Sequence, residues 1–307
     1  MSLEDQLIST AENGHLDLVK NLVEQGANLH VYNEVALVLA AEKGHLAVVK
    51  YLVEQGADLH ADDEYALVLA ARNNHLEVVK YLVEQGADLH ARDELALYWA
   101  ARNGRLDIVK YLVEQGANLH VDDEDALRWA VKFGRLSVVK YLVEQGADLH
   151  ARDDLALRWA SLFNHLDIVK YLVEQGANIH AMGEDTLILA VLNGRLDVIK
   201  YLIDQGANPQ VILDNSNNYH QGVVNYVYYL AKIMKINDQI EYAPIGRFKS
   251  FPREGVKYQE NSYRILWTRI GQEIGNAPPG HLKLLPNGSN GYQETKEWIE
   301  KGYPENE

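Results

Sequence analysis

The 307-residue sequence contains no cysteine. This absence excludes disulfide bonds, thiolate metal ligands and cysteine nucleophiles, and it is compatible with a reducing compartment. The first ten residues are acidic and polar, so they lack the basic and then apolar order of a secretory signal. No apolar run approaches the roughly 20 residues that a membrane-spanning helix needs. We therefore predict a cytoplasmic protein without membrane association.

Basic residues are scarce: 29 Lys and Arg stand against 44 Asp and Glu, for a net charge of −15. Residues 209–307 hold 11 of each sign, so the remaining 18 basic and 33 acidic residues of 1–208 carry the whole excess. Nucleic-acid binding requires many cationic side chains to displace counterions from phosphates. The composition therefore favours a protein or peptide partner over nucleic acid, and the acidic field suits a partner with a basic face.

The motifs that carry catalysis or cofactor binding are also missing. The sequence has no phosphate-binding glycine loop, no HExxH zinc motif, no EF-hand loop and no GxSxG nucleophile elbow. We predict no cofactor, no metal and no catalytic residue. The protein is then not an enzyme, although residues 238–307 leave that question open.

What the sequence does contain is a repeat of 30 residues. The phrase VVKYLVEQGADLH occurs at 48–60, 78–90 and 138–150, with close variants elsewhere. One glycine recurs without drift, at Gly26, Gly56, Gly86, Gly116, Gly146, Gly176 and Gly206. Self-similarity at a fixed period of this size indicates a solenoid, in which each unit stacks on its neighbours.

Each repeat is predicted to form two short antiparallel helices. In the second repeat, the small-residue segment 34–43 ends at Gly44, and this position is Gly or Asn in every repeat, as a left-handed helix end requires. A second helix follows, with an apolar stripe of Leu46, Val49, Leu52 and Val53. Before the first helix, predicted N-cap residues recur at Asn33, Asp63, Asp93, Asp123 and Asp153.

These repeats resemble ankyrin repeats. The segment EKGHLAVVKYLVEQGADLHA is similar to the second half of that repeat, and ALVLAA, ALYWAA and ALRWAV are similar to its first helix. The resemblance covers 1–208 and implies an all-α solenoid of helical pairs that binds proteins on its concave surface. Short repeats of this kind are similar to those of giant amoebal DNA viruses and some intracellular bacteria, for which the location would be the host cytoplasm.

Two departures from the family pattern affect the loops. Ankyrin repeats have a period of 33 and a T-P-L-H motif, whereas this period is 30 and the motif position holds Ala-Leu-Val or Ala-Leu-Arg. The three missing residues fall between Ala61 and Ala66, where the family places a projecting β-hairpin finger. We therefore expect blunted fingers, with capping by Asp in place of Thr.

Beyond the seventh repeat the pattern weakens. A shift of 28 aligns residues 194–202 with 222–230, so we predict a degenerate capping repeat over 209–237. It follows seven ankyrin-type repeats over 1–208, of which the first is also a cap. Residues 238–307 hold six of the seven prolines and are predicted to form a small C-terminal appendage of helices and irregular segments.

Histidines recur at two positions of the repeat. One set is His15, His45, His75 and His165, and the other is His30, His60, His90, His120, His150 and His180. Equivalent residues of stacked repeats lie about 10 Å apart, whereas zinc ligands each lie about 2 Å from one ion. Members of one set therefore cannot share a metal, and we predict that they pack in the loops.

One position of the first helix departs from the repeat pattern. It is leucine in repeats two, three and seven and tryptophan in repeats four to six. Aromatic residues and arginine dominate binding hot spots, and residues four apart share one helical face. The predicted partner-binding residues are Tyr98, Trp99, Arg128, Trp129, Phe133, Arg158, Trp159 and Phe163. The alternative is that the tryptophans only fill space between adjacent first helices.

These observations predict a monomeric protein-interaction scaffold or adaptor, in which the aromatic cluster grips a protein or peptide. The polar first helix argues against self-association through an end face. If the viral or bacterial resemblance holds, the partner is a host protein. An alternative is a targeting arm fused to a small effector domain in 238–307, with nuclease-like or toxin-like activity.

Overall fold

The computed structural model describes residues 2–233, and the predictions made for 234–307 lie outside the described residues. The chain divides into two compact units, Met1–Asn178 and Ile179–Glu307, and each is described by itself. The part of the chain that the structure describes is helical and contains no β-strand. The predicted all-α fold is confirmed, and the projecting fingers of longer repeats are reduced to turns.

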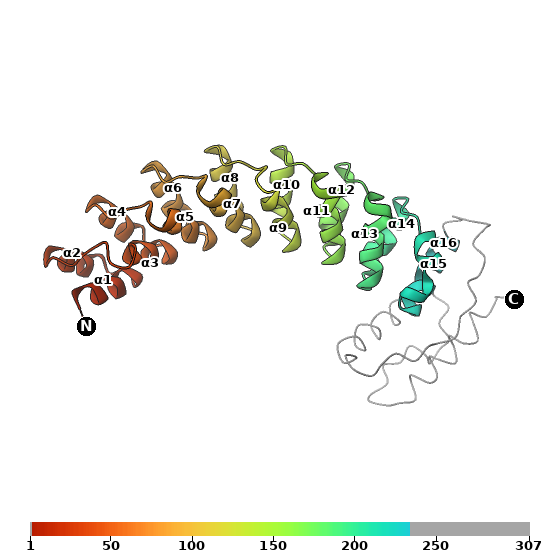
Figure 1. Ribbon diagram of the computed structural model, residues 1–307, viewed down its shortest axis with the longest axis horizontal. Helices are drawn as coiled ribbons and strands as arrows, with labels where there is room; N and C mark the ends of the chain where they lie inside the picture. The colour runs from red at the N-terminus through yellow and green to blue at the C-terminus, as the bar shows by residue number, and fades with distance from the viewer. Residues whose placement is uncertain (1, 234–307) are drawn as a thin grey trace, which may run out of the picture. The chain divides into compact units, whose positions relative to one another are not determined.

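The N-terminal unit is a stack of helix pairs. Its helices are α1 (Leu3–Glu12), α2 (Leu16–Glu24), α3 (Val35–Lys43), α4 (Leu46–Glu54), α5 (Ala61–Arg72), α6 (Leu76–Glu84), α7 (Ala91–Asn103), α8 (Leu106–Glu114), α9 (Asp125–Lys132), α10 (Leu136–Glu144), α11 (Ala151–Leu162) and α12 (Leu166–Glu174). Odd-numbered helices contact odd-numbered neighbours, and even-numbered helices do the same. Figure 1 shows the two resulting layers within this unit.

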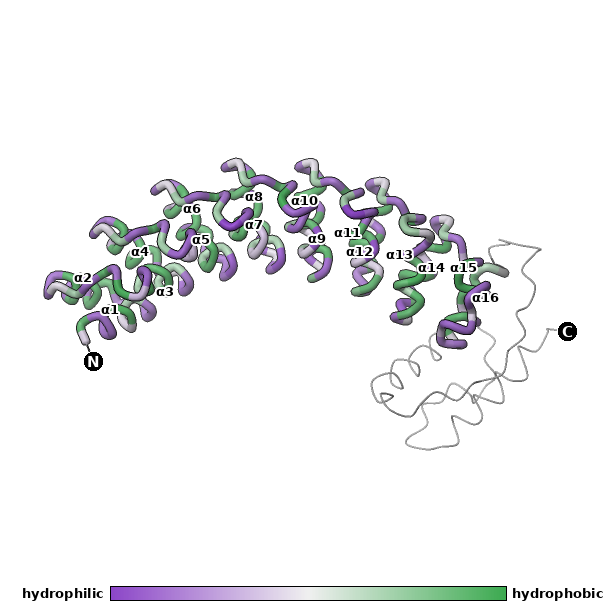
Figure 2. The backbone as a smooth tube through the Cα atoms, in the orientation of Figure 1, coloured by the Kyte–Doolittle hydropathy of each residue, from purple (hydrophilic) through white to green (hydrophobic). Residues whose placement is uncertain are grey.

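The core lies between the two layers. In the second repeat, Leu37 of α3 and Leu52 of α4 are each 1% exposed, and Ala40 and Ala41 are fully buried. The alanines allow neighbouring first helices to approach closely. Burying one leucine side chain stabilises the fold by about 1.5–3 kcal/mol. In Figure 2 hydrophobic and hydrophilic stretches alternate along the helices, while the segments joining successive pairs are mainly hydrophilic.

The predicted left-handed helix ends are confirmed. Gly44, which ends α3, has φ 79°, and Asn74 at the equivalent place has φ 73°. The glycines that follow the second helices are also left-handed, with φ 96° at Gly56 and 100° at Gly86. The 30-residue period in the sequence therefore corresponds to a recurring helix end in space.

From the second repeat on, a left-handed turn precedes the regular part of each first helix, and the sequence did not predict it. In α5, α7, α11 and α13 (Ala181–Leu192) this turn lies inside the bounds of the helix. In the third repeat, Asp62, Asp63 and Glu64 have φ of 51°, 52° and 65°. The same three positions are left-handed in every repeat from the second to the seventh. The prediction of N-caps at Asn33 and its equivalents is wrong, because these residues lie inside the turn. The actual N-cap of α3 is the next residue, Glu34, which makes no side-chain capping hydrogen bond.

The third residue of each turn is a buried carboxylate that offsets part of the backbone cost. Left-handed backbone costs roughly 1–2 kcal/mol per non-glycine residue. Glu94 is 4% exposed, and its Oε1 accepts the backbone N–H of Asn118 at 3.0 Å, 24 residues along the chain. Asp154 accepts the N–H of Asn178 in the same way at 2.8 Å. The turn of one repeat is thereby tied to the loop of the next.

The C-terminal unit is described from Ile179 to residue 233. Its helices are α13 (Ala181–Leu192), α14 (Leu196–Asp204), α15 (Gln210–Asp214) and α16 (Gln221–Ile233), with a 3₁₀ turn at Ser216–Asn218. Helix α16 packs on α14 and α15 and buries Tyr226 and Val227 completely. None of the helices described in either unit is both long and apolar enough to cross a membrane.

Candidate functional site

The aromatic residues predicted as a binding cluster form one continuous row along α7, α9 and α11. The ring centroid of Trp129 lies 5.6 Å from that of Tyr98 and 6.0 Å from that of Trp159, both in edge-to-face geometry. These distances fall within the range in which aromatic pairs attract each other. We call this row the aromatic ladder and define it as Tyr98, Trp99, Trp129, Phe133, Trp159 and Phe163.

Helical spacing adds the two phenylalanines to the ladder. Phe133 follows Trp129 by four residues, and their rings stack at 5.9 Å. Phe163 follows Trp159 in the same way, with ring centroids 6.5 Å apart. The tryptophans are half-buried, whereas Phe133 and Phe163 are 36% and 37% exposed. The rings thus pack between neighbouring helices and also present apolar surface to solvent.

Three cations lie over the ladder in addition to Arg128, whose guanidinium carbon lies 5.8 Å from the Trp159 ring, and the sequence analysis missed these three. The guanidinium carbon of Arg102 lies 4.5 Å from the Trp99 ring and 4.7 Å from the Phe133 ring. The Nζ of Lys132 lies 4.3 Å from the Trp129 ring, and the guanidinium of Arg72 lies 4.9 Å from the Trp99 ring. Such geometry allows cation–π attraction.

A sequence signal for these cations existed. Arg102 and Lys132 each follow a tryptophan by three residues, which places them on the same helical face. The equivalent position is acidic in the second repeat, at Glu42, and apolar in the sixth, at Leu162. The basic residues occupy repeats three to five and the tryptophans repeats four to six, so the two sets overlap in repeats four and five.

Arg102 is the most enclosed of the three cations. Its Nε is buried and has no hydrogen-bond partner within residues 2–233. The guanidinium also lies 5.6 Å from the Trp129 ring, so three aromatic rings surround it. Burial of the Tyr98 hydroxyl raises its pKa, an effect that the Arg102 charge opposes. Tyr98 therefore stays neutral at physiological pH.

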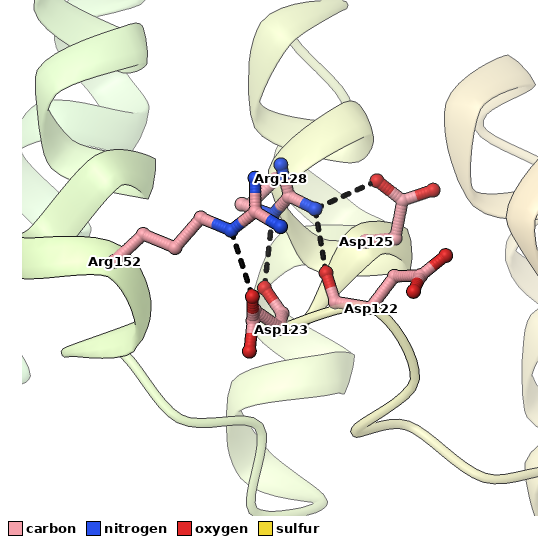
Figure 3. A network of polar contacts seen from close by, with 5 residues as sticks. All are labelled: Asp122, Asp123, Asp125, Arg128 and Arg152. Atoms are coloured by element: carbon pink, nitrogen blue, oxygen red, sulfur yellow. Dashed lines mark hydrogen bonds and ion pairs between the residues drawn. The ribbon is translucent and has the colours of Figure 1, made fainter.

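Arg128 does not occupy the place that we predicted. It is 6% exposed, so it is not available to a partner. Figure 3 shows its guanidinium turned toward the left-handed turn before α9. There it donates to the carbonyl oxygens of Asp122 and Asp123 at 2.6 and 2.9 Å and to Asp125 Oδ1 at 2.9 Å. Arg128 is thus a structural residue that holds the turn.

Neighbouring charges complete this network. Arg152 of the next repeat donates from Nε to Asp123 Oδ2 at 2.8 Å. Burial raises the pKa of Asp125, and the charge of Arg128 opposes that rise. Arg158, the remaining predicted site residue, is half-buried at the position equivalent to Arg128 and is also engaged with other groups. Arg128 and Arg152 therefore stabilise the turn and its contact with the next repeat.

In three repeats, a histidine of the first set forms a hydrogen bond to the backbone of the preceding repeat. The ring Nε2 of His45, His75 and His165 lies 2.9, 2.8 and 3.1 Å from the backbone oxygens of Glu12, Glu42 and Lys132, each 33 residues earlier. A neutral imidazole that donates there satisfies a carbonyl at the end of a first helix. Where the repeat has Arg105 instead, its Nε donates to the Arg72 oxygen at 3.3 Å.

The second set of histidines pairs with the buried carboxylates of the turns. His60 Nδ1 lies 2.5 Å from Glu64 Oε1, and His90 Nδ1 lies 2.5 Å from Glu94 Oε1. These hydrogen bonds to the carboxylates raise the pKa of both imidazoles. Among residues 2–233 no three His, Asp or Glu side chains are arranged to hold a metal ion.

Comparison with known proteins gives one family model and many solved structures. The family described as "Ankyrin repeats (3 copies)" matches residues 7–93, 92–153 and 153–212. The human ASB11 ankyrin repeat domain, known from a crystal structure, is 26% identical, with a TM-score of 0.58. The alignment covers 66% of this chain and 98% of that domain. No curated protein sequence matches the chain.

Proposed function

The chain belongs to the ankyrin repeat family, and from this premise we propose that it holds a protein or peptide partner on the aromatic ladder. Ankyrin repeats are protein-interaction scaffolds, and their fold is typically not enzymatic. The proposal assigns binding to the first helices of repeats four to six. It includes Tyr98, Trp99, Trp129, Phe133, Trp159 and Phe163, and it leaves Arg128 and Arg158 in supporting roles.

The observation that carries this proposal is the continuity of the ladder across three helices. Ring contacts link Tyr98 through Trp129 to Trp159, while Phe133 and Phe163, which contact Trp129 and Trp159, are exposed. Stacking within the fold does not require tryptophan, because the equivalent positions in repeats two, three and seven are leucine. Partly exposed aromatic residues of this kind dominate the affinity of protein interfaces.

The rest of the chain is assigned around this surface. We propose seven ankyrin-type repeats over 1–208, of which the first is a cap, a degenerate capping repeat over 209–237 and an appendage over 238–307. Helix α16 fits the capping role, since it covers α14 with Tyr226 and Val227. The excess of acidic residues in 1–208 argues against nucleic acid as the partner. We place the monomeric protein in the cytoplasm, a setting that suits a chain without cysteine.

Substitution of the ladder by the leucine of other repeats tests the proposal. Affinity capture with the full chain, followed by mass spectrometry, identifies a partner, and titration of the purified pair then gives a Kd. We expect the double variant Trp129→Leu and Trp159→Leu to weaken this Kd at least tenfold, because the contact rings are lost. Retention of the original Kd would show that the ladder is not the site.

A matched control separates binding from folding. Tyr111 lies on α8, in the layer of second helices, and is half-buried like the tryptophans. The first repeat has Asn21 at the equivalent position, so Tyr111→Asn introduces a residue that this fold already uses. This variant is expected to keep the original Kd. Circular dichroism melts of both variants then show whether any loss of binding reflects unfolding.

A further inference from the structure

The aromatic ladder carries three positive charges that the described residues do not balance. Arg72, Arg102 and Lys132 make ring contacts, but within residues 2–233 none of their side chains forms an ion pair. Elsewhere in the N-terminal unit, arginines of the turns are paired. Arg92 binds both Asp62 and Asp63, at 2.9 and 3.2 Å. The ladder is therefore a cationic strip on a protein whose net charge is −15.

The cations of the strip differ from the lysines of the second helices in hydration and in neighbouring charges. Lys50 also lies over an aromatic ring, that of Tyr81, and forms no ion pair among the described residues. It is exposed to water, however, and Glu54 follows it by one helical turn. Arg102 and Lys132 are half-buried and lie at the C-terminal ends of α7 and α9, so no residue one turn further along the same helix can pair with them. Their charges are therefore neither fully hydrated nor neutralised.

Contact with an aromatic ring stabilises the charge of a guanidinium but does not provide acceptors for its N–H groups. A ring attracts the charge through its face, whereas the N–H donors of arginine lie in the guanidinium plane and require acceptors. The Nε of Arg102 is buried without an acceptor. Carboxylates bind guanidinium through two parallel hydrogen bonds and neutralise its charge. A carboxylate supplied by a partner would not reach the buried Nε, but it would neutralise the charge of Arg102 from the accessible side of the guanidinium.

The spacing of the three cations specifies the shape of that partner. Arg72 and Arg102 share the Trp99 ring, and Arg102 and Lys132 share the Trp129 ring. Neighbouring cations are consequently at most about 10 Å apart, and because they occupy equivalent positions on adjacent first helices, their backbones are separated by about one helix spacing of 8–10 Å. A polyproline II chain has three residues per turn and rises about 3.1 Å per residue. Side chains three residues apart on such a chain recur every 9–10 Å or so on one face.

We propose that the ladder binds an acidic, extended peptide segment whose carboxylates recur at every third residue. This inference rests on the proposed function and names the partner's chemistry. The carboxylates pair with Arg72, Arg102 and Lys132, and the intervening residues cover the rings of Trp99, Trp129 and Trp159. A basic segment would place its charges against the same cations, although the net charge of the chain attracts it from a distance.

Fluorescence anisotropy with labelled synthetic peptides and the full chain tests this inference. The probe is EPPEPPEPP, and its neutral and basic counterparts are QPPQPPQPP and KPPKPPKPP. We expect the acidic probe to bind at least tenfold more tightly than either counterpart. Equal affinity for the acidic and neutral peptides, or a preference for the basic peptide or for a single-stranded DNA 12-mer, would overturn the inference.

Variants of the chain assign the preference to the cations. Arg102→Leu and Lys132→Leu introduce the leucine found at the same position at Leu162 and Leu192, so the fold already accepts it. We expect the double variant to reduce the affinity for the acidic probe at least tenfold. The matched control Lys110→Leu with Lys140→Leu removes two cations from α8 and α10 and should leave the affinity unchanged. Equal losses in the two variants would show that net charge, rather than the ladder, is responsible.

The identified protein partner separates this inference from the proposed function. Suppose that Trp129→Leu with Trp159→Leu abolishes partner binding while Arg102→Leu with Lys132→Leu does not. The proposal that the ladder is the binding surface is then supported, and the proposal that its partner is an acidic segment is wrong. If none of these substitutions changes the partner Kd, the proposed function fails as well. Circular dichroism melts of each variant confirm that the comparisons are made between folded proteins.

Discussion

The imidazole of His75 occupies the space that a side chain at Gly44 would need. A Cβ placed on Gly44 would lie 2.3 Å from His75 Nδ1, far inside contact distance. The same relationship joins Gly14 to His45 and recurs along the stack. Where the glycine is replaced by Asn74, the next repeat supplies Arg105, whose chain is flexible. The residue that ends a first helix is therefore matched to a residue 31 positions later.

This matching predicts a specific coupling. Gly44→Asn should destabilise the protein by about 1–3 kcal/mol, because overpacking forces the His75 ring to move. The second substitution His75→Arg should recover most of this loss, since it recreates the pair Asn74 and Arg105. Urea unfolding of the two single variants and the double variant measures the coupling. If Gly44→Asn lowers the free energy of unfolding equally with His75 and with His75→Arg, the two positions are not coupled and the prediction is wrong.

The fold was predictable because its signals repeat. The alternation of Gly44 and Asn74 at one position already indicated a left-handed helix end, and the structure confirms it. The left-handed turns were not predictable from local preference, because they contain residues such as Arg92 that normally avoid this conformation. Contacts made 24 residues away, such as that of Glu94 with Asn118, stabilise them instead.

The candidate site was predicted only in part, for a related reason. The tryptophans can be recognised in the sequence because they replace leucine at one position of the repeat. The burial of Arg128, in contrast, depends on hydrogen bonds to the carbonyl oxygens of the turn, which the sequence does not show. A signal for that burial was present: Val38 and Val68 occupy the equivalent position and are 7% and 1% exposed. Arginine at a position that is otherwise apolar indicates an internal polar network rather than a contact surface.

The role of Arg128 as a structural residue leads to a second prediction. Arg128→Val should cost about 1–3 kcal/mol, since it leaves Asp125 and two carbonyls with fewer partners. Adding Asp125→Val should restore much of the stability, because the second repeat has Val35 and Val38 at these two places. Thermal unfolding of both variants checks the prediction. A double variant no more stable than Arg128→Val would show that the carbonyl contacts dominate.

A third prediction concerns the conformational cost of the turns. Asp93 has φ 53°, and the seventh repeat has Gly183 at the same position. Asp93→Gly should stabilise the protein by about 0.5–1 kcal/mol, which is the left-handed cost less the extra entropy of glycine in the unfolded chain. Gly183→Ala is the reverse test, since no atom lies within 4 Å of a Cβ added there. Chemical unfolding should show opposite shifts, and a lower stability for Asp93→Gly would refute this account.

The fourth prediction concerns the protonation of His90. Its hydrogen bond to Glu94 raises the pKa above the ordinary value of 6.5, and the charges of Glu94 and Asp88 act in the same direction. Glu94→Gln should lower the pKa of His90, because the neutral amide no longer favours the imidazolium. NMR titration of the histidine Cε1 protons measures the change. His60, paired with Glu64, provides the internal control, and its pKa should not move.

The same pair fixes the sign of a pH effect on stability. Because the pKa of His90 is higher in the folded chain than in the unfolded one, its stabilising contribution is complete below about pH 6.5 and is lost as pH rises through the folded value. The His90 side chain is 62% exposed, so water screens the attraction and the contribution is small. Glu94→Gln retains an oxygen that can accept the Asn118 N–H, which isolates the protonation effect. Unfolding at pH 5.5 and pH 8.5 should therefore show a larger loss for Glu94→Gln at the lower pH, and an equal loss at both would exclude His90 as its source.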